Sequence, residues 1–281
     1  MRPPAEAFFL DSAQGRRFCL FHAPQGPCCG ALVYVHPFAE EMNKSRRMAA
    51  LQARALATLG YGVLLIDLAG CGDSEGEFGE ARWEHWKCDL AAASAWLLAR
   101  VQRPVGLWGL RLGALLALDY ARSAPQAVAH PVAQLVLWQP VLKGAPFLTQ
   151  FLRLRLAGAM LDQGAAAQGG TGALRAALAA GEALEVGGYL LAPALAAAID
   201  AADIDAGAAP ACPVHWFELA ASERALSPAA ASLSAAWTAL GRAPVMHQVA
   251  CPPFWATQEI AECGALIDAT CAALKGSADD V

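Results

Sequence analysis

Residues 105–117 of this chain read VGLWGLRLGALLA, and this stretch is the most informative about the fold. An apolar run ends in a Gly-x-x-x-Gly turn, from Gly109 to Gly113, and passes directly into a run of helical composition. The central residue of the turn is Arg111, whose guanidinium stays protonated, only donates hydrogen bonds and cannot act as a nucleophile. The stretch therefore predicts a strand, a tight turn and a helix, with a cation at the centre of the turn.

Strands and helices alternate on both sides of this turn. Continuous apolar runs predict strands that are buried on both faces, and segments with apolar residues at helical spacing separate them. The predicted strands are 31–36, 63–67 and 134–138, and the predicted helices are 45–59, 83–101 and 112–121. This strict alternation predicts a mostly parallel sheet with helices on both faces.

The two ends of the chain complete the sheet, and a different segment interrupts it. Residues 17–22 alternate with period two, which predicts an antiparallel edge strand. After Gly144 the chain is rich in Ala, Leu and Gly with almost no β-branched residues, which predicts an inserted helical cap. The expected core is 1–144 and 208–281, with strands at 214–219 and 245–249 and a helix from about 256 to 274, and the expected cap is 145–207.

Composition narrows the class of protein. Hydrophobic residues make up 57% of the 281 residues and charged residues 16%, so the core is large and the surface sparsely charged. A net charge of -5 without a basic run argues against nucleic acid. No signal pattern opens the chain, and no apolar run approaches the roughly 20 residues of a membrane span. The nine scattered cysteines predict reduced thiols in a cytoplasmic protein without metal or cofactor.

Two further motifs point to a known superfamily. His36-Pro37-Phe38 ends a predicted strand, and 67–74, DLAGCGDS, follows the next strand; the spacing to 109–113 leaves room for one helix and one strand. With these motifs the whole chain resembles the α/β-hydrolase superfamily, whose turn at this place carries a Ser, Cys or Asp nucleophile. More narrowly, 36–47, 109–113 and 252–260 are similar to bacterial exosortase A system-associated hydrolases. That name implies a link to exopolysaccharide production and protein sorting.

The resemblance also implies where catalytic residues should stand. Arg111 occupies the position of the nucleophile, and Glu223 is the candidate for the acid after the seventh strand. The base is expected in the loop 250–255, which contains no histidine, and His247 lies too early, within the strand. Because the nucleophile needs the base and the base needs the acid, a Ser-His-Asp mechanism is excluded.

Residues outside the expected triad positions are considered as catalytic groups, beginning with two cysteines. Cys71 and Cys251 follow strands at the edge where such sheets build sites, but neither has a histidine base in this reading. The resemblance implies that Asp67 and Ser74 shape a turn and that His36 holds the loop after its strand by hydrogen bonding. The weak catalytic candidates are His36, Glu40, Glu41 and Glu223.

A binding geometry survives the loss of the triad. The resemblance implies oxyanion-hole N–H donors at Phe38 and Leu112, and Trp255 lies in the loop after the last strand. A helix N-terminus with Arg111 beside it suits a carboxylate or phosphate. Glu40 and Glu41, expected in a loop over the pocket, offer Arg111 an internal partner instead, so both possibilities stay open.

Two functions follow from these alternatives. One is a non-catalytic hydrolase homologue with an anion- or acyl-binding pocket, with a protein partner left open. The other is an esterase-like or thioesterase-like enzyme with rearranged catalytic residues. The apolar cap suits an acyl group in either case.

Overall fold

The computed structural model describes residues 4–123, 131–163, 170–205, 207–220 and 226–276. Its eight-stranded sheet has the order β1-β2-β4-β3-β5-β6-β9-β10 and is parallel except at β1 and β2. The strands are β1 (Glu6–Ser12), β2 (Gly15–His22), β3 (Gly30–Val35), β4 (Tyr61–Ile66), β5 (Val105–Leu110), β6 (Leu135–Trp138), β9 (Val214–Ala220) and β10 (Val245–Ala250). This confirms the predicted mostly parallel sheet.

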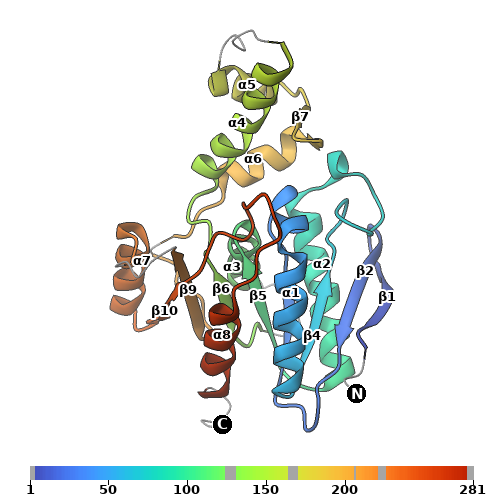
Figure 1. The fold of residues 1–281 in the computed structure, drawn as a ribbon, viewed down its shortest axis with the longest axis vertical. Helices are drawn as coiled ribbons and strands as arrows, with labels where there is room; N and C mark the ends of the chain where they lie inside the picture. The colour runs from blue at the N-terminus through green and yellow to red at the C-terminus, as the bar shows by residue number, and fades with distance from the viewer. Residues whose placement is uncertain (1–3, 124–130, 164–169, 206, 221–225, 277–281) are drawn as a thin grey trace.

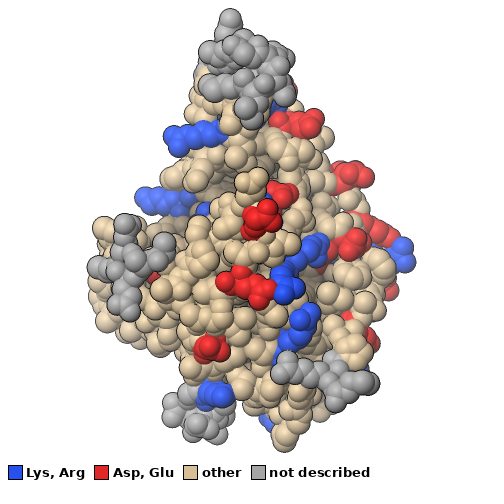
Figure 2. All heavy atoms as spheres, in the orientation of Figure 1, with Lys and Arg blue, Asp and Glu red and all other residues tan. Residues whose placement is uncertain are grey.

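Helices cover both faces of the sheet (Figure 1). Alternate side chains of β3 show the division: Val33 and Val35 belong to the core with α2 and α3, and Leu32 and Tyr34 to the core with α1 and α8. The bounds are α1 (Glu40–Thr58), α2 (Trp83–Val101), α3 (Leu112–Ser123) and α8 (Gly264–Gly276). Most of the surface in Figure 2 is uncharged, in keeping with the composition.

The predictions at the two ends of the chain were partly wrong. The strand over 17–22 is antiparallel but not at the edge, because β1 pairs along its outer side through a tight turn at Ala13 and Gln14. The last helix begins at Gly264 rather than near 256, since Pro252 and Pro253 open a segment of turns. Helix α7 (Pro228–Ala239), capped by Ser227, was not predicted.

Between β6 and β9 the chain forms a separate group of elements at one end of the molecule (Figure 1). These are α4 (Gly144–Gln163), α5 (Gly170–Ala179), β7 (Leu184–Val186), β8 (Tyr189–Leu191) and α6 (Pro193–Ala201). The β7–β8 hairpin was missed because strands of three residues leave little periodicity to read.

A buried ion pair fixes the turn after β4. Arg17 Nε lies 2.8 Å from Asp89 Oδ1, and both side chains are fully buried. The second oxygen, Oδ2, accepts the backbone N–H of Ala69 at 2.8 Å. Because every charge in this pair has hydrogen-bond partners, its burial is tolerated, and the segment 67–74 is held against β2 and α2.

Candidate functional site

The turn after β5 has the geometry that its glycines predict. Arg111 has a left-handed φ of 56°, which strains a non-glycine residue by of order 1–3 kcal/mol. A Cβ on Gly109 would lie 2.5 Å from the Cα of Ala114, and one on Gly113 would collide with the carbonyl oxygens of Val35 and His36. Close backbone approach therefore requires both glycines and lifts Arg111 above the end of the strand.

Hydrogen bonds from the next strand hold the turn in place. The Arg111 N–H donates to the Trp138 carbonyl at 3.0 Å, and the Arg111 carbonyl accepts from the N–H of Val141 at 3.2 Å. These two bonds tie the backbone of Arg111 to residues 138–141, where the chain leaves β6. The sheet therefore holds the turn that presents the Arg111 side chain.

The Arg111 side chain meets an internal partner. Its Nε and Nη2 each lie 3.4 Å from one carboxylate oxygen of Glu41, and its guanidinium carbon lies 5.2 Å from the ring centroid of Trp255. Three elements converge here: the turn after β5, the start of α1 and the loop after β10. The guanidinium is held by an ion pair on one side and by a cation–π contact on another.

The position of the two glutamates corrects the sequence interpretation. Glu40 and Glu41 form the first turn of α1 rather than a loop, with Ala39 as the capping residue. Acidic residues are favoured there because they face the positive end of the helix. Glu40 does not reach Arg111; it accepts from Asn43 at 3.2 Å and from the hydroxyl of Tyr189 in β8 at 3.3 Å.

Glu41 is incompletely satisfied by Arg111. Burial raises the pKa of Glu41 above its usual value, while the charge and the hydrogen bond of Arg111 act in the opposite direction. Its second oxygen, Oε2, is buried and has no hydrogen-bond partner among the described residues. The side chains of Arg111 and Glu41 keep 18% and 22% of their exposure, so the pair borders open space.

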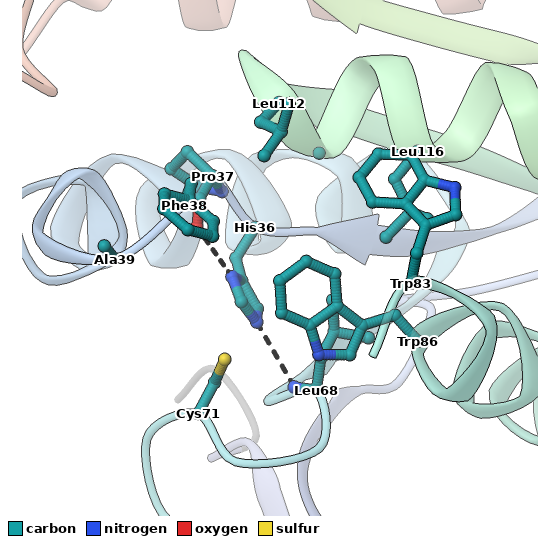
Figure 3. A pocket seen from close by; sticks show the side chains of 11 residues that line it. His36, Pro37, Phe38, Ala39, Leu68, Cys71, Trp83, Trp86, Leu112 and Leu116 are labelled. Carbon is teal, nitrogen blue, oxygen red and sulfur yellow. Dashed lines mark hydrogen bonds between the residues drawn. The ribbon is translucent and has the colours of Figure 1, made fainter. Parts of the chain in front are cut away.

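His36 has a structural role. Its Nδ1 lies 2.8 Å from the Pro37 carbonyl, and its Nε2 accepts the N–H of Leu68 at 3.2 Å (Figure 3). Burial lowers its pKa, so the ring is neutral with the proton on Nδ1. Because both nitrogens are engaged, His36 joins the segment 36–38 to the turn 67–74 and is not placed to remove a proton.

The two implied oxyanion-hole residues lie together. Phe38 and Leu112 line the same small cavity beside His36 (Figure 3), and neither backbone N–H donates to any described residue. That cavity measures about 10 Å³, which is room for one water at most. The two residues therefore lie side by side as the resemblance implied, but the cavity between them is too small for a ligand.

The remaining histidine candidate is a packed strand residue. His247 Nε2 lies 3.2 Å from His215 Nδ1, and its ring stacks on Phe217 at 4.3 Å. Burial lowers the pKa of His247. Burial, and to a smaller extent the neighbouring His247, lower the pKa of His215 to about 4. Glu223, the candidate acid, lies outside the described residues.

The cysteine candidates are unactivated thiols. Burial raises the pKa of Cys71, with Asp67 and Asp89 adding to the rise, and burial raises that of Cys251 beside Cys263. A thiol that stays protonated is a poor nucleophile. Asp67 and Ser74 shape the turn as the resemblance implied: Arg46 bonds both oxygens of Asp67, and the Ser74 hydroxyl bonds the Asp67 carbonyl at 2.5 Å.

A large cavity adjoins Arg111, and the sequence did not reveal its walls. It measures about 640 Å³, within the range of small-molecule sites. Arg111 contributes to its lining together with the loop after β6, α4, the segment after α6 and α7. Its polar lining residues are Arg111, Lys143, Gln150, Asp203, Asp205 and Ser232, and its apolar ones include Phe147 and Leu233.

Metal ligands and membrane spans were also sought. Within the described part of the chain, no three His, Cys, Asp or Glu side chains gather as a metal site would require. No helix in the same residues has the length and apolar character needed to cross a bilayer.

The sheet order and the strand, turn and helix around Arg111 define an α/β-hydrolase fold, and comparison with known proteins agrees. Residues 26–175, more than half of the chain, match the family described as serine aminopeptidase, S33. The chain belongs to this hydrolase family. No curated protein matches it.

Solved structures of the same fold are distant in sequence. Est1E from Butyrivibrio proteoclasticus with bound ferulic acid has a TM-score of 0.65 at 13% identity, covering 96% of this chain and 97% of that one. A soluble variant of monoglyceride lipase from Saccharomyces cerevisiae has a TM-score of 0.62 at 14% identity, covering 100% and 98%. Mouse alpha/beta hydrolase domain-containing protein 10 has 0.57 at 14%, covering 98% and 99%. Such identities establish the fold alone.

Proposed function

We propose that this chain is a non-catalytic member of its hydrolase family that binds a carboxylate or phosphate carrying an apolar group. The observation that supports this most strongly is Arg111 at the nucleophile position, paired with Glu41 and bordering the 640 Å³ cavity. The proposal includes the division into a core and a helical cap at 145–207, a cytoplasmic location and a role beside exosortase and exopolysaccharide systems.

Arg111 retains capacity for an external anion. Its Nη1 makes no hydrogen bond to a described residue, and its bonds to Glu41 are long. At about 4 Å and an effective dielectric near 20, one charge pair gains roughly 4 kcal/mol before desolvation. Lys143 lines the same cavity, but Asp203 and Asp205 line it too, so the attraction for an anion depends on Arg111.

Binding of an anion is coupled to protonation of Glu41. An anion that approaches Arg111 also approaches Glu41, whose pKa burial already raises. A second negative charge raises that pKa further, so Glu41 takes up a proton as the ligand binds. Anion affinity in this pocket therefore increases as the pH falls.

Calorimetric titration with benzoate, which stays ionised over this pH range, tests this function, with benzyl alcohol as the uncharged control. We expect the wild type to bind benzoate more tightly at pH 5.5 than at pH 8, and Arg111→Met to lose that binding. Arg47→Met removes a cation on the solvent side of α1 and should leave binding unchanged. Equal affinity of the wild type and Arg111→Met would refute the anion site.

The alternative enzyme remains a rearranged esterase or thioesterase with Glu41 as general base. One observation favours it: Glu41 Oε2 is buried and unpartnered among the described residues, as a base awaiting a water or alcohol would be. Hydrolysis of p-nitrophenyl or acyl-thioester substrates that is abolished by Glu41→Gln would establish this alternative. A fluorophosphonate probe should label no serine under either function, because neither uses an activated serine.

A further inference from the structure

A second groove lies on the side of the sheet that carries α1. Figure 1 shows α1 over the middle of the sheet, with β2 and β1 beside it. Three of the residues that α1 contributes to the lining of the cavities there are alanines, Ala49, Ala50 and Ala57. Because alanine side chains are short, they leave open space above the strands.

Two adjoining cavities make up this groove. One measures about 200 Å³ and the other about 410 Å³, and Leu20 and Ala50 line both. The floor of the groove is formed by alternate residues of β2, Phe18, Leu20 and His22, together with Leu65 of β4. From Phe18 to His22 a strand extends about 13 Å. The groove is therefore long, narrow and apolar along its middle.

The polar groups at one end of the groove lack partners. His22 is only 8% exposed, and no hydrogen bond joins its ring to a described residue; burial and the charge of Arg54 lower its pKa, so the ring is neutral. Arg54, across the cavity on α1, forms no ion pair with any carboxylate that the structure describes. No acidic residue among those described lines this cavity. A neutral ring that can donate one hydrogen bond, beside an exposed cation without a counter-charge, suits an anionic head group.

The opposite end of the groove is already neutralised. Arg46 bonds both carboxylate oxygens of Asp67, at 3.2 and 2.9 Å. A paired cation attracts an external charge less than an unpaired one, so the two ends differ. An anionic group is favoured at Arg54 and an uncharged tail along Leu20 and Phe18.

We propose that this groove binds a single medium-length acyl chain with a carboxylate head, the head at Arg54 and His22 and the chain along β2. The site is separate from the cavity at Arg111, since none of the residues that line the 640 Å³ cavity lines this groove. The inference therefore holds whether or not the anion site at Arg111 exists.

Titrations with fatty acids test the groove, and the background variant Arg111→Met removes the first site. In that background we expect decanoate to bind about tenfold more tightly than decanol, because only decanoate pairs with Arg54. Each methylene from octanoate to decanoate should tighten binding about fourfold, as the burial of apolar groups predicts.

Two variants locate the binding. Arg54→Gln should remove the preference for decanoate over decanol, and Ala50→Phe should block both ligands by filling the groove. Arg47→Gln removes a cation of the same helix that pairs with Glu262 and does not line the groove; it is the matched control and should change neither. Circular dichroism and melting temperature confirm that each variant is folded. Decanoate binding that survives both Arg54→Gln and Ala50→Phe, or that is absent in the Arg111→Met background, would overturn the proposal.

Discussion

The guanidinium of Arg111 reaches Glu41 through two nitrogens but only one carboxylate oxygen, each at 3.4 Å, and leaves the other oxygen buried without a described partner. A side-by-side pair would engage both oxygens and would be shorter. The charge of Arg111 is thus incompletely compensated within the protein, which is the property on which the proposed anion binding depends.

Arg111→Met should destabilise the protein by about 2 kcal/mol at pH 7, because it leaves Glu41 partly buried without its cation. Arg111→Met with Glu41→Gln should recover most of that loss, since the second change removes the uncompensated charge. Urea unfolding of the wild type, both single variants and the double variant measures the coupling. Additive effects would mean that the two side chains do not interact in solution.

The stability of the wild type should fall as the pH rises through the folded-state pKa of Glu41. Burial raises that pKa above the unfolded value, so the folded protein holds the proton more tightly. The resulting contribution is fully present below the unfolded pKa and is lost above the folded one. Urea unfolding between pH 4 and pH 8 should show this fall relative to Glu41→Gln. Parallel curves for the two proteins would contradict it.

Arg111→Ser should not create an efficient esterase. The serine would stand in the turn with oxyanion donors nearby, but both nitrogens of His36 are engaged and His247 packs against His215 and Phe217. Without a base, a serine gains little beyond oxyanion stabilisation. Hydrolysis of p-nitrophenyl acetate should stay near the wild-type background. Substantial turnover would reveal a base elsewhere, and His36→Gln and His247→Gln would locate it.

Gly113→Ala should destabilise the fold by about 3 kcal/mol, because its Cβ meets the carbonyl oxygens of Val35 and His36 and cannot displace backbone easily. Gly158→Ala is the matched control: it lies in α4 with open space around it, and alanine favours a helix by up to about 1 kcal/mol. Thermal unfolding of both variants provides the comparison. Similar melting temperatures for the two would show that the turn can relax.

The sequence predicted most of the core because the relevant signals are local. Buried strands such as β4 and β5 appear as apolar runs, and α2 was placed at its observed bounds by its own periodicity. Predictions failed where the position of an element depends on a neighbouring element. The sequence of β2 alternates like that of an edge strand, and only its pairing with β1 places it inside the sheet. Helix α1 likewise begins at Glu40 rather than at residue 45, so it includes Glu40 and Glu41.

Local sequence was sufficient to predict the strand, turn and helix around Arg111, with an arginine at the centre of the turn. Glycines at 109 and 113 and the arginine between them are properties of adjacent residues, and they constrain the backbone over one turn. Only the tertiary structure decided which glutamate meets Arg111, that Trp255 lies against it, and that Lys143 shares its cavity. These contacts join elements far apart in the chain, so they depend on how helices and loops pack around the sheet rather than on any local pattern.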